Sequence, residues 1–376
     1  MLSHNRQEMT KMRDNTMILE QFFHERNSSE STRRTYTRSI HYYEKLTGHT
    51  IQELLDIADD EEYNNIRWKN TQTREWIIAY REQLYNTYNV STAQLYLTAI
   101  LTLYRHFEIT IPPLPYFSRK GLRKSLPLNY DDLPDRELLR EVIQGCSPLV
   151  RSLILFMSSS GISRIDVLNL TIQDYLEATS TYHDHQQSVK NAIKEMRDQD
   201  IIPIFHLSRQ KTGQPYFTFC SHEAVKSINS YLLTRTEILT RDKPLFKLHE
   251  RYINMIFERL NGEFQLGKQP NGYNRLTPHM LRKYHASQLA ESGMSTEHIN
   301  LLQGRKVSGV AHEHYIRISP EHLREEYIQS LPYLVIEDVN RYKTEAEQLR
   351  EENSFYKSKE EKLNSILERL DKLEKM

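Results

Sequence analysis

The run Thr277-Pro278-His279-Met280-Leu281-Arg282 has the composition of a helix start that can bind an anion. Thr277 is a favourable N-cap, and Pro278 suits the first helical position because the N–H that proline lacks would have no helical partner there. His279 and Arg282 are three residues apart, so they lie on one face of the first turn. The free N–H groups and the positive end of the helix dipole point the same way. The run predicts a phosphate-binding start for a helix over 278–291, although a surface histidine and arginine near a helix start are also common.

A second candidate, Gly161-Ile162-Ser163-Arg164-Ile165-Asp166, follows an apolar helix predicted over 147–158. Ser163 and Asp166 have the spacing of a capping box, with aspartate in place of the usual glutamate or glutamine. Arg164 would then lie in the first turn, where a positive charge opposes the helix dipole unless an anion compensates it. Two interpretations stay open: Arg164 contacts a phosphate, or it pairs with Asp166 or another acid.

A β-hairpin is predicted within the mixed segment 131–335. Residues 201–207 and 216–219 are strand-like, and Lys211-Thr212-Gly213-Gln214 supplies the turn. Lys211 is therefore expected at the tip of the hairpin, where a lysine is usually solvated. The remaining helices predicted in this segment cover 135–144, 222–239, 249–260 and 296–303.

The N-terminal part, residues 1–109, predicts a small helical domain. Ser31 can cap a helix that runs to about Leu46, 71–88 is a second periodic stretch, and Ser91 can cap a third helix with a wide apolar face. A basic cluster lies at the start of this region, where a phosphate backbone or simply solvent would face it. Its members are Arg33, Arg34 and Arg38.

Residues 110–130 predict an extended linker between the two domains. Ile111-Pro112-Pro113-Leu114-Pro115 cannot continue a helix, because proline lacks the N–H and clashes with the preceding turn. The linker also holds four basic residues with no acid among them, which suits a segment lying on DNA. They are Arg119, Lys120, Arg123 and Lys124.

The last segment, 336–376, predicts a long helix. Five apolar residues recur there every seven positions, which is typical of a coiled coil that would pair subunits. They are Tyr342, Leu349, Tyr356, Leu363 and Leu370. Glu360, in the alternate seam, favours the other interpretation, a single solvated helix.

The bulk properties exclude several classes of protein. The 376 residues suffice for two domains, and no apolar run is long enough for a transmembrane helix or a secretory signal. The net charge is zero, so DNA binding has to be argued from local charge. The two cysteines have no pairing pattern and fit a reducing cytoplasm. No metal or other cofactor is expected, because the close histidine pairs 183/185 and 312/314 have no third ligand at a recognisable spacing.

Taken in order, these elements resemble the catalytic domain of the tyrosine recombinase family, the phage integrase type, and the resemblance covers most of 15–335. The family has an arginine in a Gly-x-Arg-x-x-Glu motif, a lysine on a hairpin, a His-x-x-Arg helix start, a Gly-His pair, and a tyrosine about nine residues later. Here these fall on Arg164, Lys211, His279 and Arg282, Gly304, and Tyr315. The amino-acid sequences of residues 161–175 and 278–317 are similar to those of archaeal integrases.

Two departures from the family pattern stand out. Aligned on Gly161 and Asp166, the family's arginine position falls on Ser163, so Arg164 is displaced by one residue. Gly304 is followed by Arg305 and Lys306 in place of the second histidine. Either side chain could donate a hydrogen bond to a phosphate, but neither is a neutral base at pH 7.

The resemblance implies a mainly α fold with a small β-hairpin, in which a helical core-binding domain precedes the catalytic domain. It implies cutting and rejoining of double-stranded DNA through a phosphotyrosine at Tyr315, without metal or ATP, by a tetramer on DNA. Two other functions stay open: a DNA strand transferase of the type IB topoisomerase kind, and a DNA-binding regulator of the same fold that has lost catalysis. A covalent trapping assay and a relaxation assay separate the three.

Overall fold

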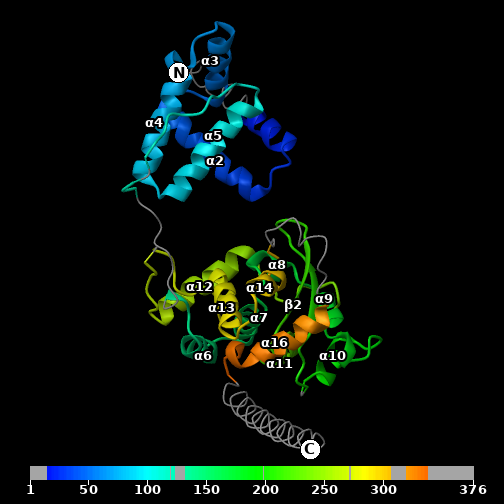
Figure 1. The fold of residues 1–376 in the computed structure, drawn as a ribbon. Coiled ribbons are helices and arrows are strands. Elements are labelled where there is room, and N and C mark those ends of the chain that lie inside the picture. The colour runs from blue at the N-terminus through cyan, green and yellow to red at the C-terminus, as the bar shows by residue number, and fades with distance from the viewer. Residues whose placement is uncertain are drawn as a thin grey trace, which may run out of the picture. The chain divides into compact units, whose positions relative to one another are not determined.

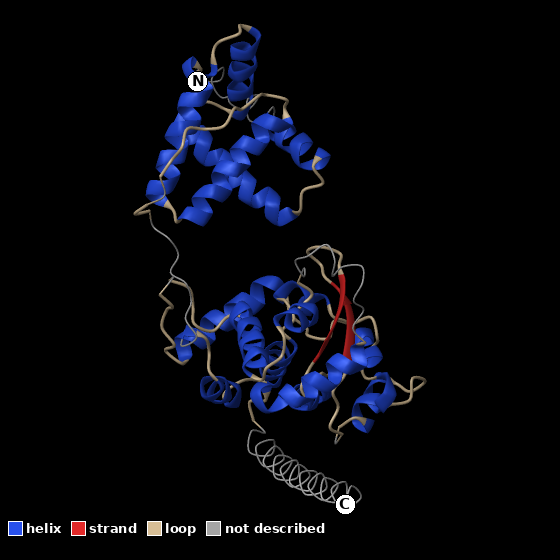
Figure 2. Ribbon diagram, in the orientation of Figure 1, coloured by secondary structure: helices blue, strands red, loops and turns tan. Residues whose placement is uncertain are grey.

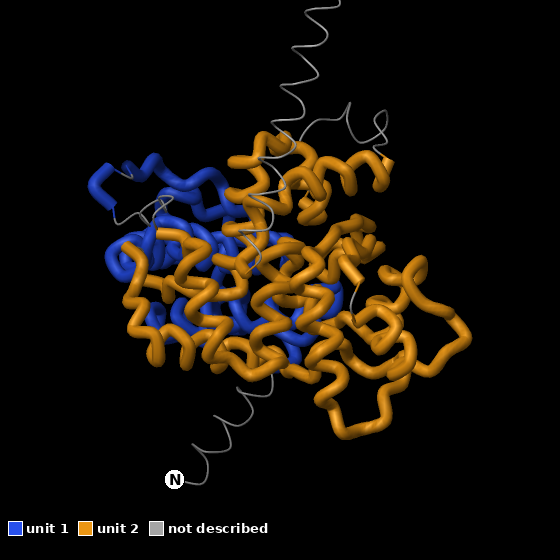
Figure 3. Tube along the Cα trace, turned by 90° about the horizontal axis from the view of Figure 1, so that it is seen from below, with its two compact units in different colours: residues 1–127 blue, residues 128–376 orange. Residues whose placement is uncertain are grey.

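The computed structural model describes residues 15–118, 120–122, 132–197, 199–270, 272–305 and 319–337. The chain divides into two compact units, unit 1 over Met1–Pro127 and unit 2 over Leu128–Met376 (Figure 3). The described residues are mainly helical with one two-stranded antiparallel sheet (Figure 2), which confirms the predicted fold class at that level. The predicted coiled coil lies outside the described residues, apart from its first two positions.

Unit 1 is a set of helices around an aromatic core. A helix over 15–25 is followed by α2 (Glu30–Thr47), α3 (Ile51–Tyr63), the short 3-10 helix η1 (Trp68–Asn70), α4 (Gln72–Thr87) and α5 (Val90–His106). Their inward faces bury Phe22, Tyr43, Tyr80 and Ile100, which are at most 1% exposed. Burial of such large apolar side chains is the main term that stabilises a helical unit of this size.

Two of the predicted caps in unit 1 were wrong by two residues. The α2 helix is capped by Ser29 rather than Ser31, and α5 is capped by Asn89 rather than Ser91. In both cases an earlier residue has a side-chain oxygen that accepts the N–H three residues on, so the helix gains half a turn. The α3 helix was not predicted, although Thr50 and Glu53 form a complete capping box.

The residues after α5 pack on unit 1 without forming a helix. Ile111 is buried, Arg81 Nη1 donates to the carbonyl oxygen of Pro115 at 2.7 Å, and the Arg81 guanidinium lies 4.8 Å from the centre of the Phe117 ring. The first part of the segment predicted as a linker is thus held against α4. Lys120 is exposed in the turn that follows.

Unit 2 is built around α7 (Pro148–Ser160), which is buried over most of its length and packs against α6, α11 and α13 (Figure 1). The other helices are α6 (Arg136–Gln144), α8 (Arg164–Asn169), α9 (Ile172–Ala178), α10 (Val189–Glu195), α11 (His222–Thr234), α12 (Glu250–Glu263), α13 (Pro278–Glu291), α14 (Thr296–Leu302) and α16 (Pro320–Leu334), with the 3-10 helix η3 (Ser180–Tyr182) after α9. The predicted helix over 222–239 ends five residues early, at Thr234, where Arg235 is extended. Helices α9, α10 and α16 were not predicted.

The hairpin consists of β1 (Ile204–Ser208) and β2 (Pro215–Phe219), paired with Ile204 opposite Phe219 and Ser208 opposite Pro215. The first strand begins after Pro203, because proline has no N–H to give to the ladder. Helix α9 packs against β1, and α14 and α16 pack against β2. The hairpin is therefore held on both sides, and its turn (209–214) starts next to the end of α14.

The end of the described chain is tied to the helices of unit 2. Arg136 donates to the carbonyl oxygens of Pro332 and Tyr333, and Arg140 donates to that of Ile336. The buried Glu223 carboxylate accepts the backbone N–H groups of Ile336 and Glu337. Residues 336 and 337 are therefore fixed against α6 and α11. Among the described residues, no helix combines the length and the apolar character that crossing a bilayer requires.

Candidate active site

The start of α13 forms as predicted and positions two of the candidate residues. The Thr277 hydroxyl accepts the Met280 N–H at 3.2 Å, and Pro278 occupies the first turn. Arg282 is only 5% exposed. Its Nη1 donates to the Gly161 carbonyl oxygen at 2.6 Å and its Nη2 to that of Gln303 at 2.5 Å. The guanidinium is therefore held between two chain segments that are remote in sequence.

Each of the two segments that hold Arg282 contains a glycine that its backbone path requires. Gly161 ends α7 with φ of 61°, and a Cβ there would lie 2.4 Å from the Nδ1 atom of His285. Gly304 follows Gln303 with φ of 59°, and its Cβ would lie 2.8 Å from the Tyr216 ring. A side chain at either position would both strain the backbone and collide with a buried ring. The two glycines thus let α7 and α14 approach α13 and the hairpin closely.

An open cleft of about 530 Å³ lies at this junction. Its lining contains cations and neutral polar groups, and no carboxylate among the described residues. The lining residues are Ser163, Arg164, Arg209, Asn254, Thr277, Pro278, His279, Arg282 and Arg305. A cleft of this composition at a helix N-terminus is suited to a phosphate group.

The cations of the cleft lower one another's pKa values. Burial, followed by the charges of Arg209 and Arg305, lowers the pKa of Arg282 to about 10. Burial, followed by Lys283, Arg282 and Arg305, lowers the pKa of His279 below its ordinary value of 6.5. At pH 7 Arg282 is therefore still charged, and His279 is a neutral imidazole that can accept a proton. A bound anion would relieve the mutual repulsion of the cations.

The sequence over residues 149–322 matches the phage integrase family. Residues 149–322 of this chain therefore resemble the phage integrase family, as the order of the motifs predicted. Members of that family are tyrosine recombinases, and the matched residues span α7 to the start of α16 and so include every residue of the cleft.

Solved structures of such enzymes are similar to this chain at low identity. A crystal structure of XerA recombinase is 17% identical, with a TM-score of 0.33, over 85% of this chain and 98% of that one. The Tn1549 transposon integrase in complex with circular intermediate DNA is 14% identical, with a TM-score of 0.47, over 84% and 98%. XerH recombinase bound to its difH substrate is 15% identical, with a TM-score of 0.41, over 67% and 69%. These scores are low, so the likeness to the family rests on the sequence match over residues 149–322. No curated protein sequence matches the chain.

Of the integrase-type residues predicted from the sequence, the structure brings Arg164, His279, Arg282 and Arg305 to one cleft. Arg164, however, already has an acidic partner: its guanidinium donates to Glu250 at 2.7 Å and to Asn254 at 2.6 Å, both on α12. This is the pairing with another acid that the sequence left open. Ser163 caps α8, as predicted, and donates to the Asp166 carboxylate at 2.7 Å.

The remaining integrase-type residues are not in the described cleft. Lys211 is exposed in the hairpin turn and is not among the cleft's lining residues. Lys306 and Tyr315 lie outside the described residues. Sequence reasoning missed Arg209 and Asn254, which both line the cleft. Arg209 stands two residues before Lys211, so the hairpin motif was the available signal for it, whereas Asn254 had none.

The basic residues predicted to bind DNA in unit 1 are in different environments. Arg34 and Arg38 are exposed on α2, and the Tyr96 hydroxyl raises the pKa of Arg38. Arg33 is partly buried, donates to the Ser28 carbonyl oxygen at 3.2 Å and lies 5.7 Å from the Phe23 ring centre. Of the predicted linker cluster only Lys120 is described, and Arg119, Arg123 and Lys124 lie outside the described residues.

Proposed function

We propose that this chain is a site-specific DNA recombinase of the integrase type, which cuts and rejoins DNA through a 3′-phosphotyrosyl intermediate at Tyr315. The observation that carries the proposal is the buried Arg282 at the start of α13, in a cleft lined by further cations and, among the described residues, by no acid. Charge of this kind is costly to bury unless an anion is bound there. The family match supports a DNA phosphodiester as that anion.

The proposed reaction begins with attack of the Tyr315 oxygen on the scissile phosphorus. The new O–P bond forms as the bond from phosphorus to the 5′-oxygen breaks, which leaves a 3′-phosphotyrosine and a 5′-hydroxyl. His279, neutral at pH 7, can accept the phenolic proton, and Lys211 is our candidate donor of a proton to the 5′-oxygen. Negative charge grows on the non-bridging oxygens in the transition state, where Arg282 and Arg305 would stabilise it.

Rejoining reverses these steps with another strand. The 5′-hydroxyl of the partner duplex attacks the phosphotyrosine, and Tyr315 is released. The energy of the broken bond is kept in the intermediate, so neither ATP nor a metal ion is part of the proposed reaction. Recombination of two duplexes requires four such sites, and we propose a tetramer on DNA to which the tail over 338–376 adds contacts. Light scattering of the chain with and without the tail tests that contribution.

DNA binding by unit 1 is proposed through the exposed side of α2. Arg34, Arg38 and Tyr42 are spaced four residues apart, so they form one exposed stripe along the helix. Lys120 and its basic neighbours at 119, 123 and 124 would add contacts to the phosphate backbone. Such contacts position the protein on DNA and should weaken strongly with salt.

Covalent trapping tests the proposal. A nicked substrate that loses the strand downstream of the cut should capture the wild-type chain as a DNA adduct, and Tyr315→Phe should form none while binding DNA normally. Tyr252→Phe is the matched control, because Tyr252 is 51% exposed on α12 and is not among the residues that line the cleft. Tyr284 and Tyr327 are at most 2% exposed, so neither is placed to replace Tyr315 as the nucleophile. A wild-type chain that binds DNA and never forms an adduct would instead indicate an inactive regulator, and relaxation without strand exchange would indicate a topoisomerase.

A further inference from the structure

The cleft contains an arginine, Arg209, that stands at or beside none of the family's motif positions. Arg209 follows β1 directly and lines the cleft together with Arg282 and Arg305. Its Nη1 atom donates to the Gly304 carbonyl oxygen at 2.8 Å. Its Nε atom is buried and has no hydrogen-bond partner, and no carboxylate among the described residues forms an ion pair with the side chain. The Nε atoms of Arg81 and Arg136 have the same feature, so what sets Arg209 apart is its place in a cleft lined by other cations.

The backbone of Arg209 is fixed, so its side chain is presented from a rigid element. Its N–H donates to the Gln214 carbonyl oxygen at 2.9 Å, and its own carbonyl oxygen accepts the N–H groups of Thr212 and Gly213. The next residue, Gln210, donates its N–H to the buried carboxylate of Asp166 at 3.0 Å. Asp166 thereby joins the start of α8 to the turn of the hairpin. A phosphate-binding group needs such a rigid support.

Two residues lie at or beside the family's arginine position, and the side chains of both are already engaged in other contacts. Ser163 stands at the family's arginine position and has no charge, and its hydroxyl is engaged with Asp166. Arg164 is displaced by one residue and is paired with Glu250 and Asn254 on α12. Its positive charge is thus largely neutralised by a carboxylate. Arg209, by contrast, lies close to other cations. Its positive charge lowers the pKa values of both Arg282 and Arg305.

We propose that Arg209 is the second arginine of this active site and donates its guanidinium to a non-bridging oxygen of the scissile phosphate, opposite Arg282. This inference rests on the proposed recombinase function and assigns a catalytic role that the motif places elsewhere. Two guanidinium groups from different elements, the hairpin and α13, would then hold the same phosphate. The shift of one residue at Ser163 and Arg164 is compensated by Arg209, which follows Arg164 by 45 residues.

The test compares single-turnover cleavage of the suicide substrate by Arg209→Ala and Arg164→Ala. Arg209→Ala should slow adduct formation about 100-fold or more, in line with the loss of one preorganised donor to the transition state. Arg164→Ala should slow it less than about 10-fold, because its guanidinium is already engaged with Glu250. Arg241→Ala is the control that should cleave as the wild type does, since Arg241 donates to the His185 carbonyl oxygen away from the cleft.

A second substrate distinguishes a direct contact of Arg209 with the phosphate from a purely structural role of this residue. It carries a methyl group in place of one non-bridging oxygen at the scissile phosphate, so the charge that Arg209 would stabilise is absent. On this substrate the difference between wild type and Arg209→Ala should shrink to less than about 10-fold, because the transition state carries one negative charge fewer and Arg282 is left to offset the remaining one. A defect equally large on both substrates would overturn the contact, since a distorted hairpin would slow both.

The outcomes also distinguish this inference from the function on which it rests. If the wild type forms no adduct on any DNA substrate, the recombinase proposal fails. If the wild type cleaves and Arg209→Ala cleaves within about threefold of it, only the assignment of Arg209 fails. A loss of about 100-fold in Arg164→Ala instead would return the role of second arginine to Arg164.

Discussion

Two arginines of unit 2 have largely buried side chains, and their surroundings differ in charge. Arg282 is 5% exposed, and the side chain of Arg235 is 6% exposed. Each donates to two backbone carbonyl oxygens: those of Gly161 and Gln303 for Arg282, and those of Pro244 and Leu245 for Arg235. Backbone oxygens satisfy the N–H donors in both places, so hydrogen bonding alone does not tell the two apart.

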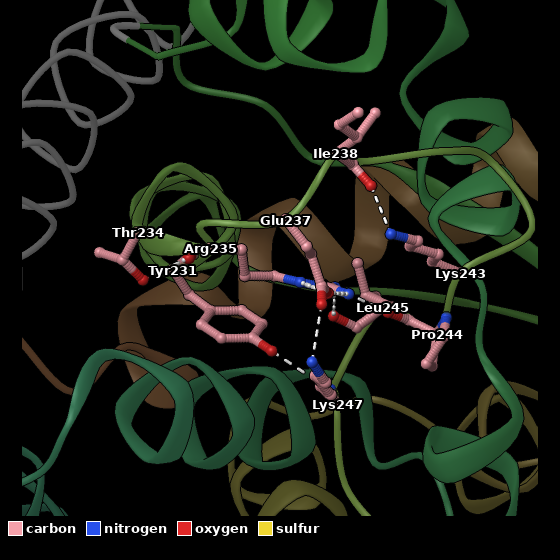
Figure 4. A network of polar contacts seen from close by, with 9 residues as sticks. All are labelled: Tyr231, Thr234, Arg235, Glu237, Ile238, Lys243, Pro244, Leu245 and Lys247. Atoms are coloured by element: carbon pink, nitrogen blue, oxygen red, sulfur yellow. Dashed lines mark hydrogen bonds and ion pairs between the residues drawn. The ribbon is translucent and has the colours of Figure 1, made fainter.

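The difference is in the charge. Arg235 contacts the carboxylate of Glu237, which also accepts from Lys247 Nζ at 2.6 Å, and its guanidinium lies 5.9 Å from the Tyr231 ring centre (Figure 4). Among the described residues no acid forms an ion pair with Arg282, which shares its cleft with Arg209, Arg305 and His279, and the charges of the two arginines outweigh that of Asp166. A neutralised arginine between two loops stabilises the fold, whereas an arginine among cations is ready to bind an anion.

Arg282→Ala should give the larger loss of function. We expect DNA cleavage to fall by a factor of about 100 to 1,000, because a buried donor to the transition-state charge is removed. The free energy of unfolding without DNA should change much less than this loss of activity suggests, since the mutation also removes repulsion from Arg209 and Arg305. Single-turnover cleavage measures the loss of activity, and urea unfolding of the same preparation measures the change in the free energy of unfolding. A variant that is inactive only because it is unfolded would contradict the comparison.

Arg235→Ala should give the opposite pattern. The change removes the arginine donor of the Pro244 carbonyl oxygen and leaves the Glu237 carboxylate with Lys247 alone, and we expect a loss of about 2–3 kcal/mol in the free energy of unfolding. Cleavage by the folded protein at 25 °C should stay within about threefold of the wild type, because Arg235 does not line the cleft. Urea unfolding and the adduct assay measure the two quantities. A stable Arg235→Ala protein that fails to cleave would show that the network in Figure 4 supports the active site.

The sequence predicted the parts of the site that depend on neighbouring residues. Thr277 and Pro278 start α13 where predicted, and His279 and Arg282 then share its first turn, because capping and helical spacing are local. The α3 helix could have been predicted from Thr50 and Glu53 in the same way. The choice between Ser29 and Ser31 as a cap could not, since both have a hydroxyl at a suitable spacing.

What the sequence could not predict depends on contacts between remote segments. Arg209 has its role because the Gly304 carbonyl oxygen, 95 residues away, accepts from it. Arg164 is paired because α12 brings Glu250 and Asn254 alongside α8, some 90 residues apart in the chain. The motif could identify the loop and the hairpin, but only the packing of α8, α12 and α14 decides which arginine is neutralised and which is left for a ligand.

The last and smallest effect concerns acid, which should act on the two regions in different pH ranges. Burial, followed by Arg282 and Arg305, lowers the pKa of His285 to about 3, while in the unfolded chain it is near 6.5. The unfolded chain therefore takes up the proton first, and stability is lost as pH falls below 6.5. At pH 5 this amounts to about 2 kcal/mol. Lys247 and Arg235 lower the pKa of Glu237 to about 2, so the stabilisation from Glu237 is present above about 4.5 and is lost only as pH falls from there towards 2.

Urea unfolding at pH 7 and pH 5 distinguishes the two groups. His285→Gln should remove most of the loss between these pH values, because glutamine can still accept the Gln303 amide N–H but does not titrate. Glu237→Gln should leave that difference unchanged and reduce only the loss below pH 4.5. His24→Gln, at an exposed histidine of unit 1, is the control that should keep the wild-type pH dependence. If His285→Gln retained the full loss at pH 5, His285 would not be the group whose protonation destabilises the fold, and its burial beside Arg282 and Arg305 would not set the acid response of this region.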